Sequence, residues 1–397
     1  MIKSIEIKNF KSIDNLKIDL GRLNIIIGAN GSGKTNILEA IAMGAASSAD
    51  KLDYEFISNR LRVSSPEFMY NAFPTNKSKF IEIKIKTHNN KYNYNLISKN
   101  ERSWIDRNKD EFQHEIHKLL IDLFKGNENP VVKENAELET LSSIFSSLLK
   151  DENIEKDDTF NEIIPVITKK IINDNFSSKE ISDFLIYTPE YSFLRKFEEP
   201  GQIIPLGLKG EGLFYTIKQI FNNKKNNLQK EEIKRGLHLL DWFDDFYIPD
   251  NLMSNEYKIA IKDRFIRPKI RYFDQRSANE GFLYLLFYLV LFTSKNTPKF
   301  FAIDNIETGF NPKLCRNLTT LFYKLAKKFN KQVIVTTHNP AILDGLNLSD
   351  DKQRLFVAYR KNDGSTALER IKHKPNSNMK LSELWMKGII GGLPDNF

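Results

Sequence analysis

The sequence predicts an α/β fold in which a phosphate-binding loop joins a buried strand to a helix. Residues 23–27 form a short run rich in β-branched side chains, typical of a strand buried on both faces. Glycine-rich residues 28–35 follow at once, and helical apolar spacing continues from Asn36. Two more apolar runs, 300–303 and 333–335, each end in polar residues. Because ligands bind at the carboxyl ends of parallel strands, these runs indicate a site at one sheet edge.

The predicted α/β head is interrupted by a helical insertion. The chain has 397 residues, 41% of them hydrophobic, which is enough for one large domain with an insertion or for two domains. We expect the head to occupy residues 1–100 and 255–397, the second part including a tail, and the insertion lobe to occupy residues 101–254. The lobe is predicted to be helical because apolar residues recur at helical spacing, at Ile116, Leu119, Leu120, Leu123, Leu141, Ile144, Leu148 and Leu149.

Shorter patterns predict the elements around these strands. Apolar and polar residues alternate on both sides of a turn at residues 9–12, which predicts a hairpin. A second hairpin is predicted around Asn89-Asn90, and a third over residues 355–367. Helical spacing predicts helices at residues 230–246 and 312–329.

The glycine-rich loop Gly28-Ala29-Asn30-Gly31-Ser32-Gly33-Lys34-Thr35 matches the phosphate-loop pattern at every fixed position. Its glycines allow backbone N–H groups to surround a β-phosphate, and the next helix adds its positive end. Lys34 would neutralise the β- and γ-phosphates, and the Thr35 hydroxyl would bind Mg²⁺. We expect ATP to be bound by Asn30, Gly31, Ser32, Gly33, Lys34, Thr35 and Asn36.

Two other strand ends carry polar groups of matching chemistry. Asp304 ends the run 300–303, where its carboxylate would hold Mg²⁺ through a water or by polarising Thr35. His338 follows the run 333–335 and is predicted to sense the γ-phosphate.

The order of these motifs resembles the ABC-type ATPase heads of the RecF/SMC/OLD group, a class of P-loop NTPases. It is most similar to the short AAA ATPases of prokaryotic anti-phage and abortive-infection modules. The segments Ile7-Lys8-Asn9-Phe10-Lys11-Ser12 and Thr336-Thr337-His338-Asn339-Pro340 carry the likeness together with the phosphate loop. The resemblance covers residues 1–100 and 255–372.

The resemblance implies that two heads enclose two ATP molecules, in a homodimer or a higher homo-oligomer. Asn279, Glu280 and Gly281 align with the family signature, which usually begins with Ser, so Asn279 and Gly281 would contact the ATP of the partner head. Asn279 is also suited to cap a helix start. The segment Asn311-Pro312 would cross the dimer interface.

The residue after Asp304 departs from the family pattern. A catalytic Glu is usual there, whereas this chain has Asn305, and a neutral amide cannot act as a general base. If the strand stays extended, Glu307 would project on the same side as Asn305 and could replace the missing base. Otherwise hydrolysis is slow and ATP acts as a long-lived clamp.

Composition bears on partners and location. The excess of 59 Lys+Arg over 51 Asp+Glu gives a formal charge of +8, which makes DNA a candidate partner without deciding the matter. The absence of a long apolar run predicts no membrane partner, and the single cysteine, Cys315, agrees with a cytoplasmic location. The tail segment 382–394 is predicted to pack on its own domain or to dock on a partner protein.

Three functions are therefore open. The leading hypothesis is a nucleotide-gated sensor or scaffold of a phage-defence system that controls a separately encoded effector. The first alternative is a RecF-like DNA-repair ATPase that clamps DNA. The second is a module that binds ATP without turnover, as Asn305 would allow.

Overall fold

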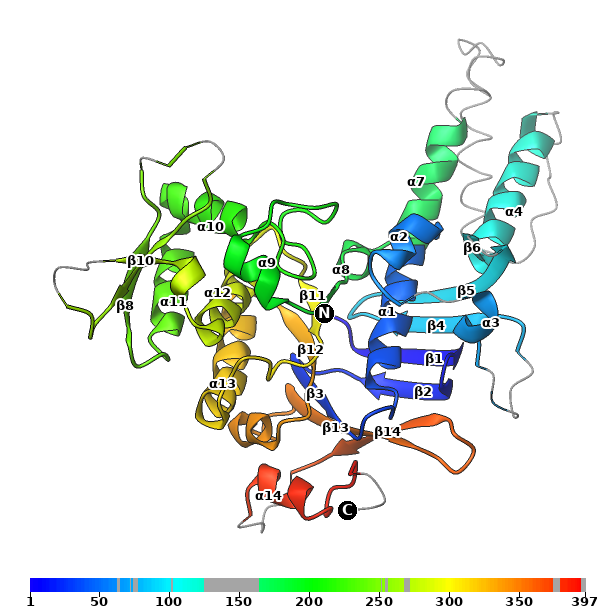
Figure 1. Ribbon diagram of the computed structural model, residues 1–397. Helices are drawn as coiled ribbons and strands as arrows, with labels where there is room; N and C mark the ends of the chain where they lie inside the picture. The colour runs from blue at the N-terminus through cyan, green and yellow to red at the C-terminus, as the bar shows by residue number, and fades with distance from the viewer. Residues whose placement is uncertain are drawn as a thin grey trace.

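Two large sheets, a small three-stranded sheet and the helices between and around them make up the computed structural model (Figure 1). It describes residues 1–62, 65–71, 73, 78–100, 103–124, 164–250, 252–253, 256–267, 272–373 and 379–393. Four residues used to predict the helical insertion, Leu141, Ile144, Leu148 and Leu149, lie outside this set. Among the described residues, no helix has the length and hydropathy needed to cross a membrane.

The central sheet has six strands in the order β14-β13-β3-β12-β11-β7. Its strands are β3 (Leu23–Ile27), β7 (Ile186–Tyr187), β11 (Phe300–Ile303), β12 (Gln332–Thr336), β13 (Gln353–Arg360) and β14 (Thr366–Ile371). All neighbours are parallel except β13 and β14, and Ile25 of β3 pairs with Val335 of β12. The carboxyl ends of β3, β11 and β12 therefore meet at one edge, as the apolar runs predict.

Both faces of the central sheet are buried. Ile25 and Ile27 of β3 belong to one hydrophobic cluster, which includes the helices α12 (Glu280–Thr293) and α13 (Pro312–Lys328). The intervening Ile26 belongs to a second cluster on the opposite face. Full burial of such a side chain contributes about 1.5–3 kcal/mol. This two-sided burial explains why the strands are apolar throughout.

The second cluster joins the central sheet to a five-stranded antiparallel sheet of order β2-β1-β4-β5-β6. Helix α1 (Lys34–Ser48), which starts at the end of the phosphate loop, packs within this cluster. A Cβ on Gly44 of α1 would lie 3.0 Å from Ile83 Cγ2, so helix and sheet are in close contact. The strands are β1 (Ser4–Phe10), β2 (Ile13–Asp19), β4 (Ile81–Lys86), β5 (Lys91–Asn100) and β6 (Ser103–Asp106), which confirms the first two predicted hairpins.

The segment predicted as a helical lobe also contains strands. Helices α4 (Arg107–Phe124) and α7 (Ile164–Phe176) extend away from the head side by side (Figure 1), and the rings of Phe112 and Phe176 are 5.5 Å apart. Strands β6 and β7 of the same segment belong to the two main sheets. The boundaries proposed at 100/101 and 254/255 remain predictions.

The helix predicted over residues 230–246 is wrong in its second half. Helix α11 (Asn227–Leu237) ends before the strand β8 (Phe243–Tyr247), which pairs with β9 (Ala260–Asp263). Phe243 and Phe246 are both fully buried there, and this packing outweighs the local helical spacing.

The remaining elements are α2 (Tyr54–Ser58), α3 (Pro66–Met69), α8 (Lys179–Ser182), α9 (Tyr191–Lys196), α10 (Leu213–Asn222), β10 (Phe273–Asp274), α14 (Leu381–Met386) and the short 3₁₀ helices η2 (Lys224–Asn226), η3 (Gln275–Ser277) and η4 (Pro340–Gly345).

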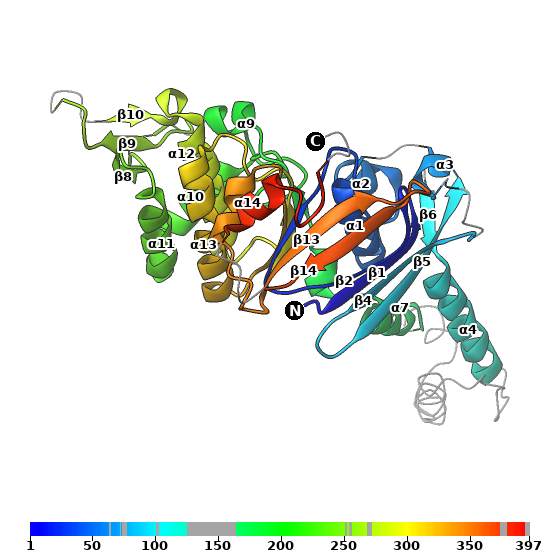
Figure 2. The same cartoon turned by 90° about the horizontal axis from the view of Figure 1, so that it is seen from below.

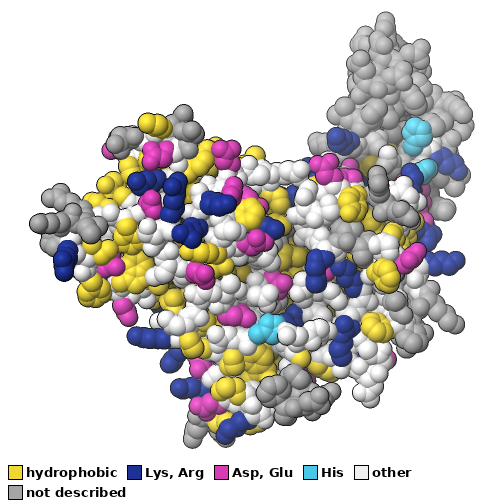
Figure 3. Space-filling model, viewed as in Figure 1, with side chains coloured by type: hydrophobic (Ala, Val, Ile, Leu, Met, Phe, Trp, Pro, Cys, Tyr) yellow, Lys and Arg dark blue, Asp and Glu magenta, His cyan; other side chains and the backbone are white. Residues whose placement is uncertain are grey.

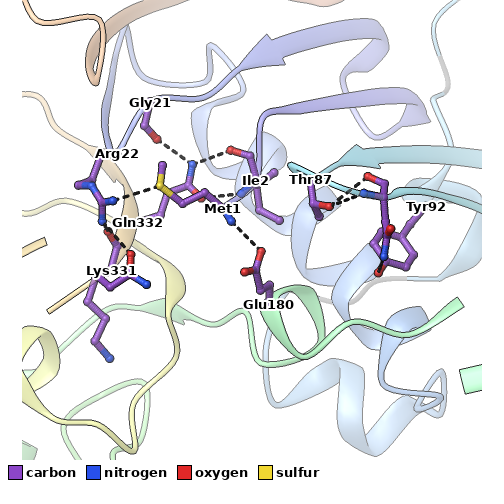
Figure 4. A network of polar contacts seen from close by, with 11 residues as sticks. Met1, Ile2, Gly21, Arg22, Thr87, Tyr92, Glu180, Lys331 and Gln332 are labelled. Atoms are coloured by element: carbon purple, nitrogen blue, oxygen red, sulfur yellow. Dashed lines mark hydrogen bonds and ion pairs between the residues drawn. The ribbon is translucent and has the colours of Figure 1, made fainter. Parts of the chain in front are cut away.

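A buried glutamine connects the two sheets at the end opposite the phosphate loop (Figure 4). Gln332, at the start of β12, is 2% exposed. Its Nε2 donates to the carbonyls of Ile2 at 2.8 Å and Gly21 at 2.7 Å, and its Oε1 accepts from the Ile2 N–H at 2.9 Å. Because all three bonds are buried, they fix the entry of β1 and of β3 relative to β12.

Candidate nucleotide-binding site

The phosphate loop has a backbone conformation that favours glycine at three positions. Gly28, Gly31 and Gly33 have φ values of 149°, 76° and 98°. A Cβ on Gly28 would lie 2.2 Å from the Ala358 carbonyl oxygen, and one on Gly33 would lie 2.1 Å from Thr366 Oγ1. The loop is therefore pressed against β13 and β14 as well as being tightly turned. Helix α1 begins directly after Gly33, so its positive end faces the loop.

Lys34 lies in the centre of this loop and is 6% exposed. Its Nζ donates to the carbonyl oxygens of Gly28 at 2.9 Å and Ala29 at 3.0 Å. Burial lowers the pKa of its ammonium group to about 8, although the carboxylates of Asp304 and Glu307 act in the opposite direction. A poorly hydrated cation beside a glycine-rich loop and the start of a helix is suited to bind a polyphosphate.

Thr35 and Asp304 provide the oxygen atoms that Mg²⁺ prefers. Thr35 Oγ1 donates to Asp304 Oδ2 at 3.1 Å, and Asp304 Oδ1 accepts from Thr336 Oγ1. The carboxylate lies directly after β11, where the sequence predicts it. One hydroxyl and one carboxylate are a small ligand set, which suits a Mg²⁺ ion that also coordinates phosphates and water.

Asn305 leaves the strand instead of extending it. Strand β11 ends at Ile303, and Asn305 has φ 55°, in the left-handed region. Its N–H donates to Thr336 Oγ1 at 2.9 Å, and its carbonyl accepts from the Thr308 N–H at 3.4 Å. The extended geometry that would place Asn305 and Glu307 on one face is therefore wrong, because the chain turns here.

The turn nevertheless brings Glu307 to the end of β12. Glu307 Oε2 accepts from Thr337 Oγ1 at 2.8 Å, and its Oε1 accepts from the backbone N–H of His338 at 2.9 Å. Its charge also acts on Lys34, across the site. Glu307 thus lies between the phosphate loop and the His338 segment, and it fixes the backbone of that segment.

His338 is an exposed residue directly after the buried strand β12 and Thr337. Partial desolvation and the charge of Lys34 lower the pKa of its imidazole, against the effect of Glu307 and Asp304. The side chain is therefore neutral at pH 7, and one ring nitrogen can donate to an anionic oxygen. Lys34, Thr35, Asp304, Glu307 and His338 form one group at the carboxyl edge of the sheet.

A chain of hydroxyls behind the loop was not predicted from the sequence. Asn36 Nδ2 donates to Ser12 Oγ at 2.7 Å, and Ser12 Oγ lies 2.7 Å from Thr366 Oγ1. Thr366 Oγ1 in turn donates to the Ser32 carbonyl at 3.0 Å. Nearby, Arg360 Nε donates to the Gly31 carbonyl at 2.8 Å. These contacts fix the Gly31 and Ser32 carbonyls against β13 and β14, and the Ser32 N–H donates within the loop to the Ala29 carbonyl at 3.2 Å.

An ion-pair cluster beside the loop was also missed. Glu39 of α1 is 1% exposed, and its carboxylate accepts from Lys11 Nζ at 2.7 Å and from Arg62 Nε at 2.8 Å. The sequence places Glu39 in the helix after the phosphate loop, but it does not show that Glu39 pairs with Lys11 and Arg62. Two residues before Arg62, the Arg60 guanidinium lies over the Phe56 ring, with Cζ 3.4 Å from the ring centroid.

Asn279 and Gly281 lie elsewhere, at the start of α12. Asn279 Oδ1 accepts from the Phe282 N–H at 2.9 Å, the cap that the sequence predicts. A Cβ on Gly281 would lie 3.2 Å from the carbonyl oxygen of Gly309. Both residues line a hollow with Asn311, the N-cap of α13. Within the described residues, no hydrogen bond links them to their own phosphate loop.

The Thr366 hydroxyl provides a test of how the loop is supported. Thr366→Val keeps the side-chain shape but leaves the Ser32 carbonyl without its donor, so we expect about five- to thirtyfold weaker ATP binding, equivalent to about 1–2 kcal/mol. Isothermal titration calorimetry measures this effect. The matched control is Thr320→Val. Thr320 lies on α13, and its hydroxyl donates to the Gly345 carbonyl at 3.3 Å. Equal affinities of the two variants would contradict the prediction.

Comparison with known proteins agrees with this geometry. A profile of the family described as "AAA domain, putative AbiEii toxin, Type IV TA system" matches residues 23–344. An "ATP/GTP phosphatase" of Helicobacter pylori is 25% identical over 378 residues, covering 87% of this chain and 88% of that protein. A "DNA replication and repair protein RecF" of Lactococcus lactis is 56% identical over 41 residues, which are 10% of this chain and 12% of that protein.

The fold also matches a solved structure, an SMC head bound to the C-terminal winged-helix domain of ScpA. The TM-score is 0.52 at 16% identity, and the match covers 94% of this chain and 98% of that one. The family profile spans most of the chain and includes the phosphate loop, Asp304 and His338. The chain therefore belongs to this AAA family, within the RecF/SMC/OLD-like group of ABC-type ATPases.

Proposed function

We propose that the protein binds Mg-ATP, hydrolyses it slowly, and pairs its heads around the nucleotide. In that state it would act as a nucleotide-gated sensor or scaffold of a prokaryotic phage-defence system and would regulate a separate effector. One observation carries the nucleotide chemistry: Lys34, the Thr35–Asp304 pair and the Glu307–His338 pair come from three parallel strand ends and lie at one edge. The defence role rests on the family description, which names a toxin of a toxin–antitoxin system.

Each residue has a specific part in this proposal. The Lys34 ammonium, now bonded to the Gly28 and Ala29 carbonyls, would turn to the β- and γ-phosphates. Thr35 and Asp304 would hold Mg²⁺, which neutralises phosphate charge when bound. Backbone N–H groups of residues 30–36 would bind the phosphate oxygens.

Glu307 is the carboxylate available to activate water in place of the missing Glu at position 305. It already accepts two hydrogen bonds, from the Thr337 hydroxyl on Oε2 and from the His338 N–H on Oε1. Both of its oxygens are therefore engaged, which leaves fewer acceptor positions for the attacking water and supports slow hydrolysis. His338, neutral and beside it, would donate to the γ-phosphate.

Pairing of heads would use the second set of predicted residues. Asn279 and Gly281 lie on the surface at a helix start, beside Asn311, where they would contact ATP in a partner head. Each nucleotide would then contact both heads only in the closed state, so ATP shifts the population toward the pair.

The RecF-like alternative draws on the short match to RecF. On the face shown in Figure 3, however, the basic side chains of the described residues are interspersed with acidic and apolar ones instead of forming a continuous band. This pattern favours a protein partner over a DNA duplex lying across this face.

Lys34 gives a prediction for pH. In the protein without nucleotide, the Lys34 side chain is charged below pH 7 and loses its charge as the pH rises through its pKa of about 8. Bound phosphates would raise this pKa, so ATP binds the charged form more tightly. From the fraction of charged lysine, ATP affinity should fall about tenfold between pH 7 and pH 9. Equilibrium binding with a fluorescent ATP analogue measures it.

Two controls accompany the pH series. Lys34→Arg stays charged, so whatever affinity it retains should not change between pH 7 and pH 9. Thermal unfolding without nucleotide at each pH separates lost binding from lost stability. An affinity of the unaltered protein that stays level to pH 9 would count against the assigned role of Lys34.

Glu307 gives the test of turnover. Glu307→Gln should abolish phosphate release and leave ATP affinity within about threefold, because the amide cannot accept a proton. Glu369→Gln, on the exposed part of β14, is the control. Asn305→Glu should raise the rate. Unchanged phosphate release by Glu307→Gln would refute the role of Glu307, and its complete absence from the unaltered protein would leave an ATP-binding module.

Pairing and partner are tested together with the Glu307→Gln protein, in which ATP should persist. Light scattering should show the mass doubling with Mg-ATP and not with Mg-ADP, and Gly281→Asp should prevent it, because the new side chain would meet the Gly309 carbonyl. Co-purification of a toxic protein supports the defence role. ATP-dependent DNA binding with a steep salt dependence, without such a protein, would instead favour the repair clamp.

A further inference from the structure

The end of the described chain returns to the phosphate loop. Helix α14 (Leu381–Met386) lies near β13 (Figure 2), and Trp385 is 4% exposed within the main hydrophobic cluster. Residues 389–393 follow α14, and we name them the strap. Gly391 and Gly392 of the strap have φ values of 73° and 80°, a left-handed conformation that glycine adopts at little cost.

Gly392 packs directly on the first residue of the phosphate loop. A Cβ on Gly392 would lie 3.3 Å from Gly28 Cα, 2.6 Å from Val357 Cγ1 and 3.7 Å from Trp385 Nε1. Gly28 also lies against β13, because a Cβ on it would lie 2.2 Å from the Ala358 carbonyl oxygen. The backbone of Gly28 thus contacts both β13 and the strap.

The helix that carries the strap is fastened to the His338 segment. The N–H and hydroxyl of Ser382 donate to the two carboxylate oxygens of Asp344, at 3.1 and 2.9 Å. Asp344 belongs to η4, which begins at Pro340, two residues after His338. Asn339 caps η4 by accepting from the Ala341 N–H at 2.9 Å. One short segment therefore contacts both the start of the phosphate loop and the helix after His338.

We propose that the strap is a positioning element of the nucleotide site, which holds the Gly28 backbone in the conformation that binds phosphate. The Gly28 carbonyl is one of the two that Lys34 contacts, so its position also sets that of the ammonium group. A loop fixed before binding loses less conformational entropy when the ligand arrives, and affinity is higher for that reason. This inference rests on the proposed binding of ATP at the phosphate loop.

The experiment compares two glycines with the same backbone conformation. Gly392→Ala places a methyl group against Gly28, whereas Gly388→Ala, at the end of α14 with φ 69°, has its nearest neighbour at 4.0 Å, in Leu393. Gly392→Ala should weaken ATP binding at least tenfold. Gly388→Ala should stay within twofold of the unaltered protein, although both variants carry the same left-handed strain.

A second pair of proteins separates contact with Gly28 from contact with Val357. Val357→Ala removes the 2.6 Å contact, so in that background the methyl group of Gly392→Ala meets chiefly Gly28. The double variant should still bind ATP at least fivefold more weakly than Val357→Ala alone. Thermal unfolding without nucleotide checks that all variants are folded.

The fluorescence emission of Trp385 supplies a readout that would not respond to ATP in any variant if the strap had a purely structural role. The chain has three tryptophans, so Trp104→Phe/Trp242→Phe leaves Trp385 as the sole emitter. Because the strap is fixed before binding, saturating ATP should leave this emission unchanged, whereas Gly392→Ala, which loosens the strap, should make the emission respond to ATP.

The outcomes are distinct. Equal ATP affinity of the Gly392→Ala and Gly388→Ala proteins, or Trp385 emission that does not respond to ATP in the Gly392→Ala protein either, would overturn the role of the strap. Failure of the unaltered protein to bind ATP at all would instead refute the proposed function.

Discussion

The site depends on the parallel pairing of β3, β12 and β11. Val335 is aligned with Ile25 on one side and Ile303 on the other, so three strands end at the same level. Residues far apart in the chain, Lys34, Asp304 and His338, thereby come to one edge. Parallel strands need covered faces, and the two hydrophobic clusters provide them. A slip of one residue in β12 would move each of its apolar side chains into the opposite hydrophobic cluster.

This edge concentrates groups that are costly to bury. Lys34 is desolvated, and the Gly28 and Gly33 backbones are in conformations closed to other residues. The surrounding contacts offset this cost. Strands β13 and β14 pack against the loop, and Thr366 and Arg360 donate hydrogen bonds to its Ser32 and Gly31 carbonyls. The conformation of the phosphate loop thus depends on its contacts with the hairpin β13–β14 as well as on its own glycines.

Local patterns were sufficient to predict the buried strands β3, β11 and β12, the phosphate loop and the positions of Asp304 and His338. They were sufficient because each signal is contained in a few consecutive residues with a defined period. The predicted helix over 230–246 failed where burial of Phe243 and Phe246 in a small sheet decided the conformation. An extended strand at Asn305 would have placed Glu307 on the same face, but the left-handed φ of Asn305 turns the chain.

The contacts of Thr366, Arg360 and Glu39 could not be predicted for a different reason. Each contact joins two elements that are far apart in the sequence, and local residue spacing does not show which distant elements pack against each other. The packing of Gly392 on Gly28 is the extreme case, since 364 positions, the difference between the two numbers, separate the residues. The tail was predicted to pack on its own domain or to dock on a partner, and the burial of Trp385 agrees with the first.

The two hydrogen bonds of Glu307 have a consequence for timing. If this carboxylate takes a proton from the attacking water, its negative charge is lost, and a neutral carboxyl group accepts hydrogen bonds less strongly. The bonds from the Thr337 hydroxyl and the His338 N–H would then weaken together. The proton released in hydrolysis would itself be the signal that loosens the His338 segment, so the segment could shift only after the phosphate bond has been attacked.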